Sequence, residues 1–392
     1  MGLHVLLTQG LLPSALAVAR SLTAEGHRVT MGDHDGTVIA RFSRHVSRFV
    51  HLPPPAPNPR RFFEAVVETG RRVGADVVLP LFEEGLMLAA YWDNTRQLQA
   101  AMPPYPLARL LADKGTGVER AARAGLPIAE TRIASAGVKV LANDLGFPMV
   151  LKPRLSTSGV GVRVVRTQEE LLRVLAALPQ PEDYVAQRWA GAREVVFQGV
   201  FEKGRCVAAH AYTVLVRHPP EHGFGILLES ITDASILGYG LRLGEDTGYH
   251  GALGIDFLAD EDGVTRVVEI NPRLVLGVVN ALDAGVPIAA AAAELGRVRS
   301  TTVDVRRPRY ARGVRTLHWP SAAVTATTGE PMGVQLMQWA RKRLEDPGAL
   351  AAFFASVVAH RVRGGFRTAA LADRSFSASL ARQLDKERAV AV

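Results

Sequence analysis

Two carboxylates and an amide occur with strand spacing in the second half of the sequence. Glu269 and Asn271 lie two residues apart in an apolar segment, and Asp256 precedes Glu269 by thirteen residues in another. If the two segments form a hairpin, all three side chains can project from one face, because side chains alternate along a strand. Carboxylate and amide oxygens suit Mg²⁺, with phosphate oxygens and water completing its shell. Arg273, after Pro272, would add a planar cation beside the metal. The alternative to a metal site is that these residues form only the end of a strand with a surface ion pair.

A lysine precedes a loop of small residues in a second region. Lys152 ends the apolar segment 147–152, and the loop that follows contains Ser156, Thr157, Ser158, Gly159 and Gly161. Such a loop can bring backbone N–H groups close to phosphates, and the lysine can bury its stem while its charged tip faces the loop. The chain has no GxxxxGK[ST] sequence, so this is not a Walker A loop. The alternative is an ordinary turn.

A third feature is the Asp113-Lys114 pair, which stands out because the chain has six lysines among its 46 Lys and Arg residues. Lys is a compact point charge, whereas Arg is a rigid planar fork, so a chain that prefers Arg makes each Lys noteworthy. The alternative is an exposed ion pair at the start of a helix.

The order of apolar segments predicts the fold class. Residues 1–106 alternate strand patterns with amphipathic segments, which indicates a parallel α/β sheet, and Pro103, Pro104 and Pro106 mark its end. Later segments predict an α+β region with an antiparallel sheet. The expected strands are 4–8, 27–31, 76–81, 148–152, 162–165, 184–187, 194–201, 206–214, 226–231, 252–259 and 265–270, and the expected helices are 13–24, 62–73, 83–91 and 168–177.

Composition excludes several classes of protein. With 392 residues, 48% of them hydrophobic, the chain is not disordered and is long enough for several domains. Its single cysteine, Cys206, excludes an intramolecular disulfide and a multi-cysteine zinc site. We expect a cytoplasmic protein with no membrane partner, because neither a signal peptide nor a membrane-spanning run is evident. The net charge of +8 is scattered without a nucleic-acid-binding motif, so we expect anionic small molecules rather than nucleic acid as partners.

The three features together resemble the ATP-grasp superfamily in order and spacing, specifically carboxylate–amine ligases and the ATP-binding domain of carbamoyl-phosphate synthase. The family has a lysine in an Asp-Lys pair before Gly-x-Pro, a lysine before a Ser/Gly phosphate loop, an adenine hinge, and a metal hairpin ending in E-x-N-P-R. The resemblance covers residues 107–295. It implies an α/β pre-ATP-grasp domain (1–106), an ATP-grasp domain (107–300, with subdomains 107–185 and 186–300), and a mixed or helical C-terminal region (301–392).

The resemblance also implies residue roles. Lys114 and Lys152 would contact the phosphates of ATP, and Glu194 would bind the ribose hydroxyls. The full set of implied nucleotide-binding residues is Lys114, Lys152, Ser156, Thr157, Ser158, Gly159, Gly161, Gln187, Arg188, Trp189, Ala190 and Glu194. Backbone groups of Arg188 and Ala190 would read the adenine. Gln187 stands where many relatives have Glu, which departs from the family pattern.

The implied metal ligands are Asp256, Glu269 and Asn271, which would hold Mg²⁺, or Mn²⁺ as a substitute, on the β- and γ-phosphates. Glu269 would bridge two ions. Arg273 would stabilise charge on the transferred phosphoryl group, so that Arg273, Lys152 and Glu269 form the implied catalytic set.

The resemblance implies an ATP-dependent ligase that joins a small carboxylate to an amine through an acyl phosphate. Dimers are frequent among such ligases. The residues 216–225 suggest a mobile loop in which Arg217 or His218, with Arg273, would receive the substrate carboxylate; the alternative is a surface hairpin. Two other functions stay open: an enzyme that activates bicarbonate, and an ATP-binding regulator without turnover.

Overall fold

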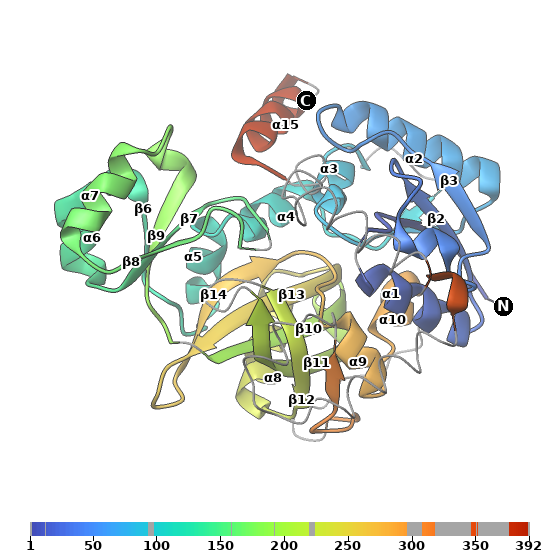
Figure 1. Ribbon diagram of the computed structural model, residues 1–392. Coiled ribbons are helices and arrows are strands. Elements are labelled where there is room, and N and C mark those ends of the chain that lie inside the picture. Colours follow the sequence, from blue (N-terminus) through green and yellow to red (C-terminus); the bar gives the residue numbers. More distant parts are fainter. Residues whose placement is uncertain are drawn as a thin grey trace.

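The computed structural model describes residues 2–11, 13–92, 98–157, 159–191, 193–218, 224–295, 308–317, 346–349, 351 and 376–390. Within these residues the chain forms three sheets, which Figure 1 shows side by side. One is parallel and N-terminal, one is small and antiparallel, and one is large and antiparallel. The mixed fold class expected from the sequence is confirmed.

The N-terminal sheet has the strand order β3-β2-β1-β4-β5. Its strands are β1 (His4–Thr8), β2 (Arg28–Asp33), β3 (Arg48–His51), β4 (Val77–Pro80) and β5 (Gln99–Ala100), with helices α1 (Pro13–Ala24), α2 (Pro59–Val73) and α3 (Glu84–Ala89). Val5 packs in the cluster that contains α1, whereas Leu6 packs with Phe62 and Val66 of α2. Because alternate side chains of a strand point to opposite faces, both faces are buried, as expected for apolar parallel strands.

The small sheet has the order β6-β9-β7-β8. It consists of β6 (Thr131–Ile133), β7 (Met149–Pro153), β8 (Arg163–Val165) and β9 (Tyr184–Arg188), and it follows the short helices α4 (Tyr105–Ala112) and α5 (Thr116–Arg123). Leu141 of α6 (Val138–Leu145) and Leu171 of α7 (Gln168–Ala176) pack against Met149 and Leu151 of β7. This packing fixes β7, whose end carries Lys152.

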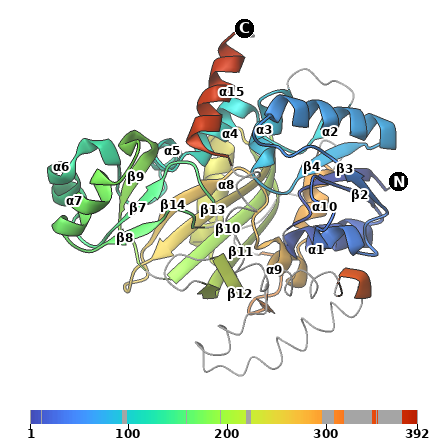
Figure 2. The ribbon, with the colours of Figure 1, turned by 45° about the horizontal axis from the view of Figure 1, so that its top comes forward.

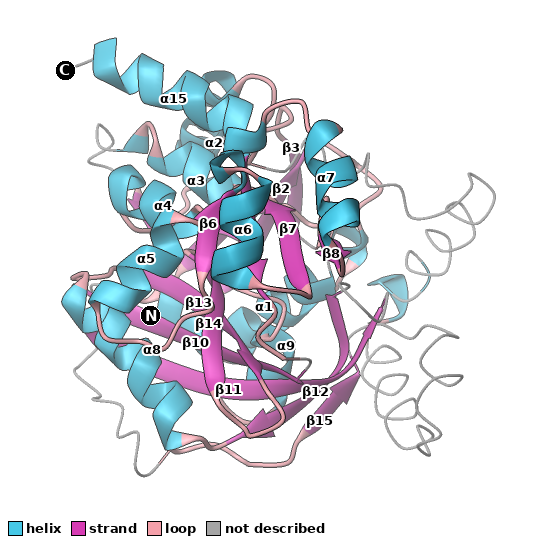
Figure 3. Cartoon of the chain, turned by 90° about the vertical axis from the view of Figure 1, so that its left-hand side faces the viewer, coloured by secondary structure: helices cyan, strands magenta, loops and turns pink. Residues whose placement is uncertain are grey.

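The large sheet has the order β14-β13-β10-β11-β12-β15, and its strands pair antiparallel. Its strands are β10 (Arg193–Glu202), β11 (Arg205–His218), β12 (Phe224–Ile231), β13 (Gly251–Ala259), β14 (Thr265–Asn271) and β15 (Arg315–Leu317). Figure 3 shows α8 (Ala234–Asp246) along one side of this sheet. Gly240 and Gly244 permit that close approach, because a Cβ at these positions would lie 2.4 and 2.0 Å from the rings of Phe197 and Phe201.

Helix α8 is absent from the elements expected from the sequence. It begins after Asp233, whose carboxylate accepts hydrogen bonds from the N–H groups of Ser235 and Ile236, as an N-cap residue does. With α8 on one face, the polar residues of β13 and β14 lie on the other face of the sheet.

Further helices are α9 (Val278–Asp283), α10 (Ile288–Ala293) and α15 (Ala378–Val390). Helices α9 and α10 share a core with α1 and the parallel sheet. Helix α15 is distant in sequence but packs in one apolar cluster with α3 and α4, beside which Figure 2 shows it. No helix among the described residues is both long and apolar enough to cross a membrane.

Candidate active site

The hairpin β13–β14 brings the predicted metal ligands together. Asp256 pairs with Glu269 across the two strands, and Gly254 pairs with Asn271. Directly opposed residues of an antiparallel pair share a face, so the three side chains lie on one surface, as the spacing predicts. The Asn271 Nδ2 donates a hydrogen bond of 2.9 Å to Asp256 Oδ2.

Negative charge is concentrated at this hairpin. Burial raises the pKa of Asp256 well above its usual value, and the charges of Glu269 and Glu194 raise it further, whereas Arg273 opposes the rise. Carboxylates that destabilise each other's charge in this way are suited to a divalent cation. The described residues contain no group of three or more His, Cys, Asp and Glu placed to hold a metal. Asp256, Glu269 and Asn271 supply two carboxylates and an amide oxygen, which are hard donors of the kind that suit Mg²⁺, an ion that keeps several ligands from phosphate and water.

Both lysines singled out in the sequence analysis are buried beside Glu269. The Nζ of Lys114 lies 3.2 Å from Glu269 Oε1 and donates a hydrogen bond of 2.7 Å to the Ser156 carbonyl. The Nζ of Lys152 donates to the Val268 carbonyl at 3.1 Å and to Gln187 Oε1 at 2.9 Å. Burial lowers the pKa of Lys152 to about 8, although the Glu269 charge raises it. Lys114 thus joins the loop to the β13–β14 hairpin, and Lys152 joins Gln187 to the same hairpin.

Asp113 is not part of an exposed ion pair. It is 1% exposed, and Arg154 binds it with Nη2 at 2.8 Å from Oδ2. Although burial raises the pKa of Asp113, the hydrogen bond and charge of Arg154, the Gly115 N–H and the Arg109 charge hold it below its usual value. This buried carboxylate excludes the surface alternative for Asp113-Lys114.

The predicted phosphate loop follows β7 directly. Gly161 has a φ of +77°, and a Cβ there would lie 2.8 Å from the Pro153 ring, so both its backbone conformation and its close contact favour glycine. Thr157 is buried, and its Oγ1 accepts a hydrogen bond of 3.2 Å from Arg273 Nη2. Arg273 therefore links the loop to the end of the hairpin. Ser158 lies outside the described residues.

The predicted adenine hinge begins with Gln187, which is buried. Its Oε1 accepts from Lys152, and its Nε2 donates to Thr131 Oγ1 at 2.9 Å. The N–H of Arg188 donates to the Glu130 carbonyl at 2.8 Å within the sheet. Trp189 is partly buried and Ala190 is buried. Gln187, where many relatives carry Glu, therefore orients a lysine.

Glu194 and Arg217, predicted to bind different substrates, bind each other. Arg217 Nη2 lies 2.5 Å from Glu194 Oε2. Burial raises the pKa of Glu194, and Arg217 opposes this while Glu269 adds to it. The loop expected over 216–225 is shorter than predicted, because β11 extends to His218 and β12 begins at Phe224. The His218 side chain lies outside the described residues.

Two residues between β4 and α3, Phe82 and Glu83, also reach the site, and the sequence analysis missed both. The Arg273 guanidinium lies 5.0 Å from the centre of the Phe82 ring. Glu83 is buried, and burial raises its pKa while the charges of Arg273 and Lys114 lower it. Their position directly after the strand β4 could have indicated this from the sequence, because open α/β sheets bind ligands at the carboxyl ends of their parallel strands.

Sequence comparison finds distant relatives. No protein-family model matches the chain. It is 24% identical over 238 residues to the 2-oxoglutarate carboxylase small subunit of Hydrogenobacter thermophilus. The aligned region covers 54% of this chain and 49% of that protein. It is 29% identical over 178 residues to the D-alanine–D-alanine ligase of Geobacter sulfurreducens. This aligned region covers 42% of this chain and 56% of the ligase. The chain thus spans about half the length of these relatives.

Structural comparison finds the same fold. The biotin carboxylase–β,γ-ATP complex from Campylobacter jejuni matches with a TM-score of 0.64 and 17% identity, over 79% of this chain and 74% of that one. At this identity the likeness shows the fold. The sequence relatives and the structural neighbour are ATP-grasp ligases, so the chain has the fold of the superfamily that its motifs resemble.

Proposed function

We propose that the protein is an ATP-dependent ligase that joins a small carboxylate to an amine and releases ADP and phosphate. The observation that carries this proposal is the ion pair between Lys114 and Glu269, at 3.2 Å. It connects the loop suited to phosphates with the carboxylates suited to Mg²⁺. Transfer of a phosphoryl group requires these two parts to act on the same triphosphate.

The nucleotide would lie between the small sheet and the large sheet. Lys114, Lys152 and backbone groups of the loop 156–161 would bind its phosphates, and the hinge 187–190 its adenine. Asp256, Glu269 and Asn271 would hold Mg²⁺, which supplies charge neutralisation at the β- and γ-phosphates when bound. The raised pKa of Asp256 supports this assignment, because burial and the charges of Glu269 and Glu194 destabilise the ionised carboxylate, and a bound cation would stabilise it.

The proposed reaction has two steps. A carboxylate is a poor electrophile because oxide is a poor leaving group. One carboxylate oxygen therefore attacks the γ-phosphorus, the bond to ADP breaks, and an acyl phosphate forms. The amine then attacks the acyl carbon, phosphate leaves, and the amine loses a proton. Arg273 and the lysines hold the anions together, so the protein contributes mainly positioning and electrostatic stabilisation.

Arg217 has a different role in this proposal from the one first expected. Because its guanidinium binds Glu194, we assign it to keeping the Glu194 carboxylate ionised for the ribose hydroxyls. Arg273 remains the candidate cation for the substrate carboxylate. It lies against Phe82 and beside the buried carboxyl of Glu83, at the edge of the parallel sheet.

A second candidate is an enzyme that activates bicarbonate instead of an organic acid. The specific support is the similarity to the 2-oxoglutarate carboxylase subunit and to biotin carboxylase. The same phosphate and metal residues would serve that reaction, since bicarbonate is also a carboxylate-like anion that ATP can phosphorylate.

The test is an ADP-release assay with Mg²⁺ over amino acids, small carboxylic acids and bicarbonate, with hydroxylamine present to trap an acyl phosphate. The expected result is ADP release that depends on one organic acid and yields its hydroxamate. Release with bicarbonate alone would favour the second candidate. ATP binding without ADP release for any acid would indicate a regulator. Glu269→Gln is the control for contaminating activity, because it should bind ATP and release no ADP.

A further inference from the structure

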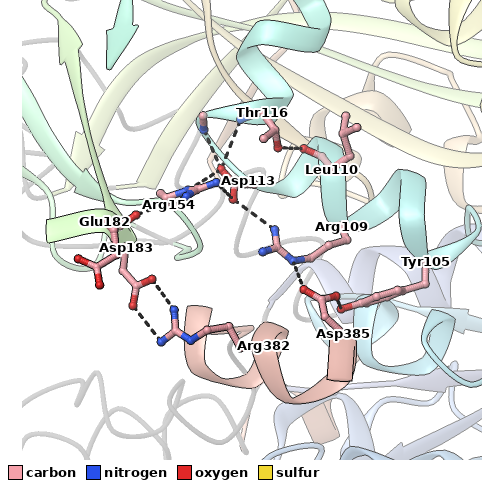
Figure 4. Close-up of polar contacts among 11 residues, drawn as sticks. Tyr105, Arg109, Leu110, Asp113, Thr116, Arg154, Glu182, Asp183, Arg382 and Asp385 are labelled. Carbon is pink, nitrogen blue, oxygen red and sulfur yellow. Dashed lines mark hydrogen bonds and ion pairs between the residues drawn. The ribbon is translucent and has the colours of Figure 1, made fainter. Parts of the chain in front are cut away.

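Helix α15 contacts two separate parts of the fold through two residues on one side of the helix (Figure 4). Arg382 binds the end of η4 (Pro181–Asp183), with Nη1 at 2.5 Å from Asp183 Oδ1 and Nη2 at 3.1 Å from Oδ2. Asp385 accepts a hydrogen bond of 2.7 Å from the Tyr105 hydroxyl and lies 3.7 Å from Arg109 Nε. The helix thus connects η4, which leads into β9 of the small sheet, with α4.

The two contacted parts are joined again beneath the helix. Arg109 Nη1 donates to Asp113 Oδ2 at 3.2 Å, and Arg154 Nε donates to Asp113 Oδ1 at 3.1 Å. The N–H of Arg154 donates to the Asp183 carbonyl at 2.8 Å. The contacts therefore form a closed ring from α15 through Asp183, Arg154, Asp113 and Arg109 back to α15.

This ring encloses the segments that carry the candidate phosphate-binding groups. Lys114 follows Asp113, and its N–H donates to the Arg154 carbonyl at 3.0 Å. Ser156 is two residues beyond Arg154, and its carbonyl accepts from Lys114 Nζ. A change in the position of Asp113 or Arg154 therefore moves the lysine and the loop together.

Apolar packing supports the same coupling. Leu380, Ala381 and Leu384 of α15 share one buried cluster with Ala108 of α4 and with Leu155, the residue before Ser156. The helix thus contributes both buried apolar side chains and exposed ion pairs to the neighbourhood of the loop. The buried side chains anchor α15, and the ion pairs fix its register.

We propose that α15 is a positioning element for the nucleotide site. Arg382 and Asp385 act through Arg154 and Asp113 to hold Lys114 and the loop after β7 in the arrangement that binds a nucleoside triphosphate. This role rests on the proposed function for its ligand. None of the four residues touches the reacting atoms; each acts through the segment it holds.

Arg382→Glu tests the role in the full chain, because the side chain is half exposed and its replacement leaves the apolar cluster intact. The substitution places a second carboxylate beside that of Asp183, so the two side chains repel each other. We expect the Kd and KM for ATP to rise about three- to tenfold, with kcat changed less than twofold. Asp183→Arg in the same chain should restore the affinity. The matched control is Arg123→Glu, which reverses a charge in the exposed Arg123–Glu119 pair of α5.

Amide hydrogen exchange of the nucleotide-free protein provides a second measurement, which does not depend on the proposed function. In Arg382→Glu we expect faster exchange at the amides of Lys114 and Arg154, and recovery in the double variant. If these amides and the ATP affinity match the Arg123→Glu control, the positioning role of α15 is overturned, whatever reaction the protein performs. If the amides respond but the wild type binds no nucleotide, the proposed function fails while the mechanical coupling through α15 stands.

Discussion

Asp256 lies opposite Glu269 across the β13–β14 pair, and the two carboxylates have different partners. Glu269 forms an ion pair with Lys114, whereas Asp256 accepts a hydrogen bond from Asn271. Of the two, Asp256 has no such ion pair among the described contacts, and burial together with the charges of Glu269 and Glu194 raises its pKa. A bound cation would correct that imbalance, and several properties of the protein should follow from it.

Asp256→Asn should separate folding from metal binding. Without Mg²⁺, we expect the variant to be at least as stable as the wild type, because the substitution removes a repelled carboxylate. With Mg²⁺ and ATP at a hundredfold excess over Kd, the wild type should gain about 2–3 kcal/mol and the variant little. Thermal unfolding with and without both ligands measures this. The control is Asp260→Asn, four residues further along, which should gain as much stability from Mg²⁺ and ATP as the wild type does. An equal gain in Asp256→Asn would contradict the metal assignment.

Gln187→Glu should shift the pH dependence of ATP use. Lys152 has a pKa of about 8, so its charged fraction falls above that pH, and kcat/KM for ATP should fall with it. A carboxylate in place of the amide oxygen, 2.9 Å from Nζ, favours the charged lysine. The alkaline limb should therefore move upward by about one pH unit. The exposed Gln168→Glu is the control, and identical profiles for both variants would remove Lys152 as the titrating group.

Glu84 should make stability depend on pH. It is fully buried, and burial raises its pKa to about 7, although the hydrogen bond from Thr8 lowers it. A carboxyl with a raised pKa holds its proton more tightly in the folded state, so its contribution is present at low pH and is lost as the pH rises from about 4.5 to about 7. The loss is about 3 kcal/mol.

Glu84→Gln should remove this dependence. Denaturant unfolding at pH 5 and pH 8 should show the variant gaining stability relative to the wild type at the higher pH. Glu68→Gln, on the exposed side of α2, serves as the comparison. A constant difference between Glu84→Gln and the wild type at both pH values would show that Glu84 is ionised throughout.

Arg217→Ala should affect ATP rather than the acid substrate. Loss of the cation lets burial and Glu269 raise the pKa of Glu194 further, which disfavours the ionised carboxylate. We expect the KM for ATP to rise about fivefold, a cost typical of one ion pair. The ratio of this KM to that of the wild type should shrink as the pH is raised, because a higher pH favours the ionised Glu194 carboxylate. Steady-state kinetics with the neighbouring Arg193→Ala as control measure this; a higher KM for the acid alone would return Arg217 to carboxylate binding.

Local patterns in the sequence determined the elements and the faces they present. The bounds of β1 and α1 agree with the expected ones, and β13 and β14 differ from theirs by one residue at one end. The pairing of Asp256 with Glu269 was also predictable, because a strand fixes which side chains share a face and a short turn fixes which residues meet.

The partners of those side chains were decided by the tertiary structure. The pairs Gln187–Lys152, Arg217–Glu194 and Arg273–Phe82 join elements whose mutual placement depends on the packing of whole sheets. The periodicity of a strand predicts which face of the sheet a side chain lies on, but it does not predict which residue of another element that side chain contacts. Helix α15 is the extreme case, because the sequence predicted its region only as mixed or helical. Its contacts with Asp183 and Arg109 arise from packing against α3 and α4.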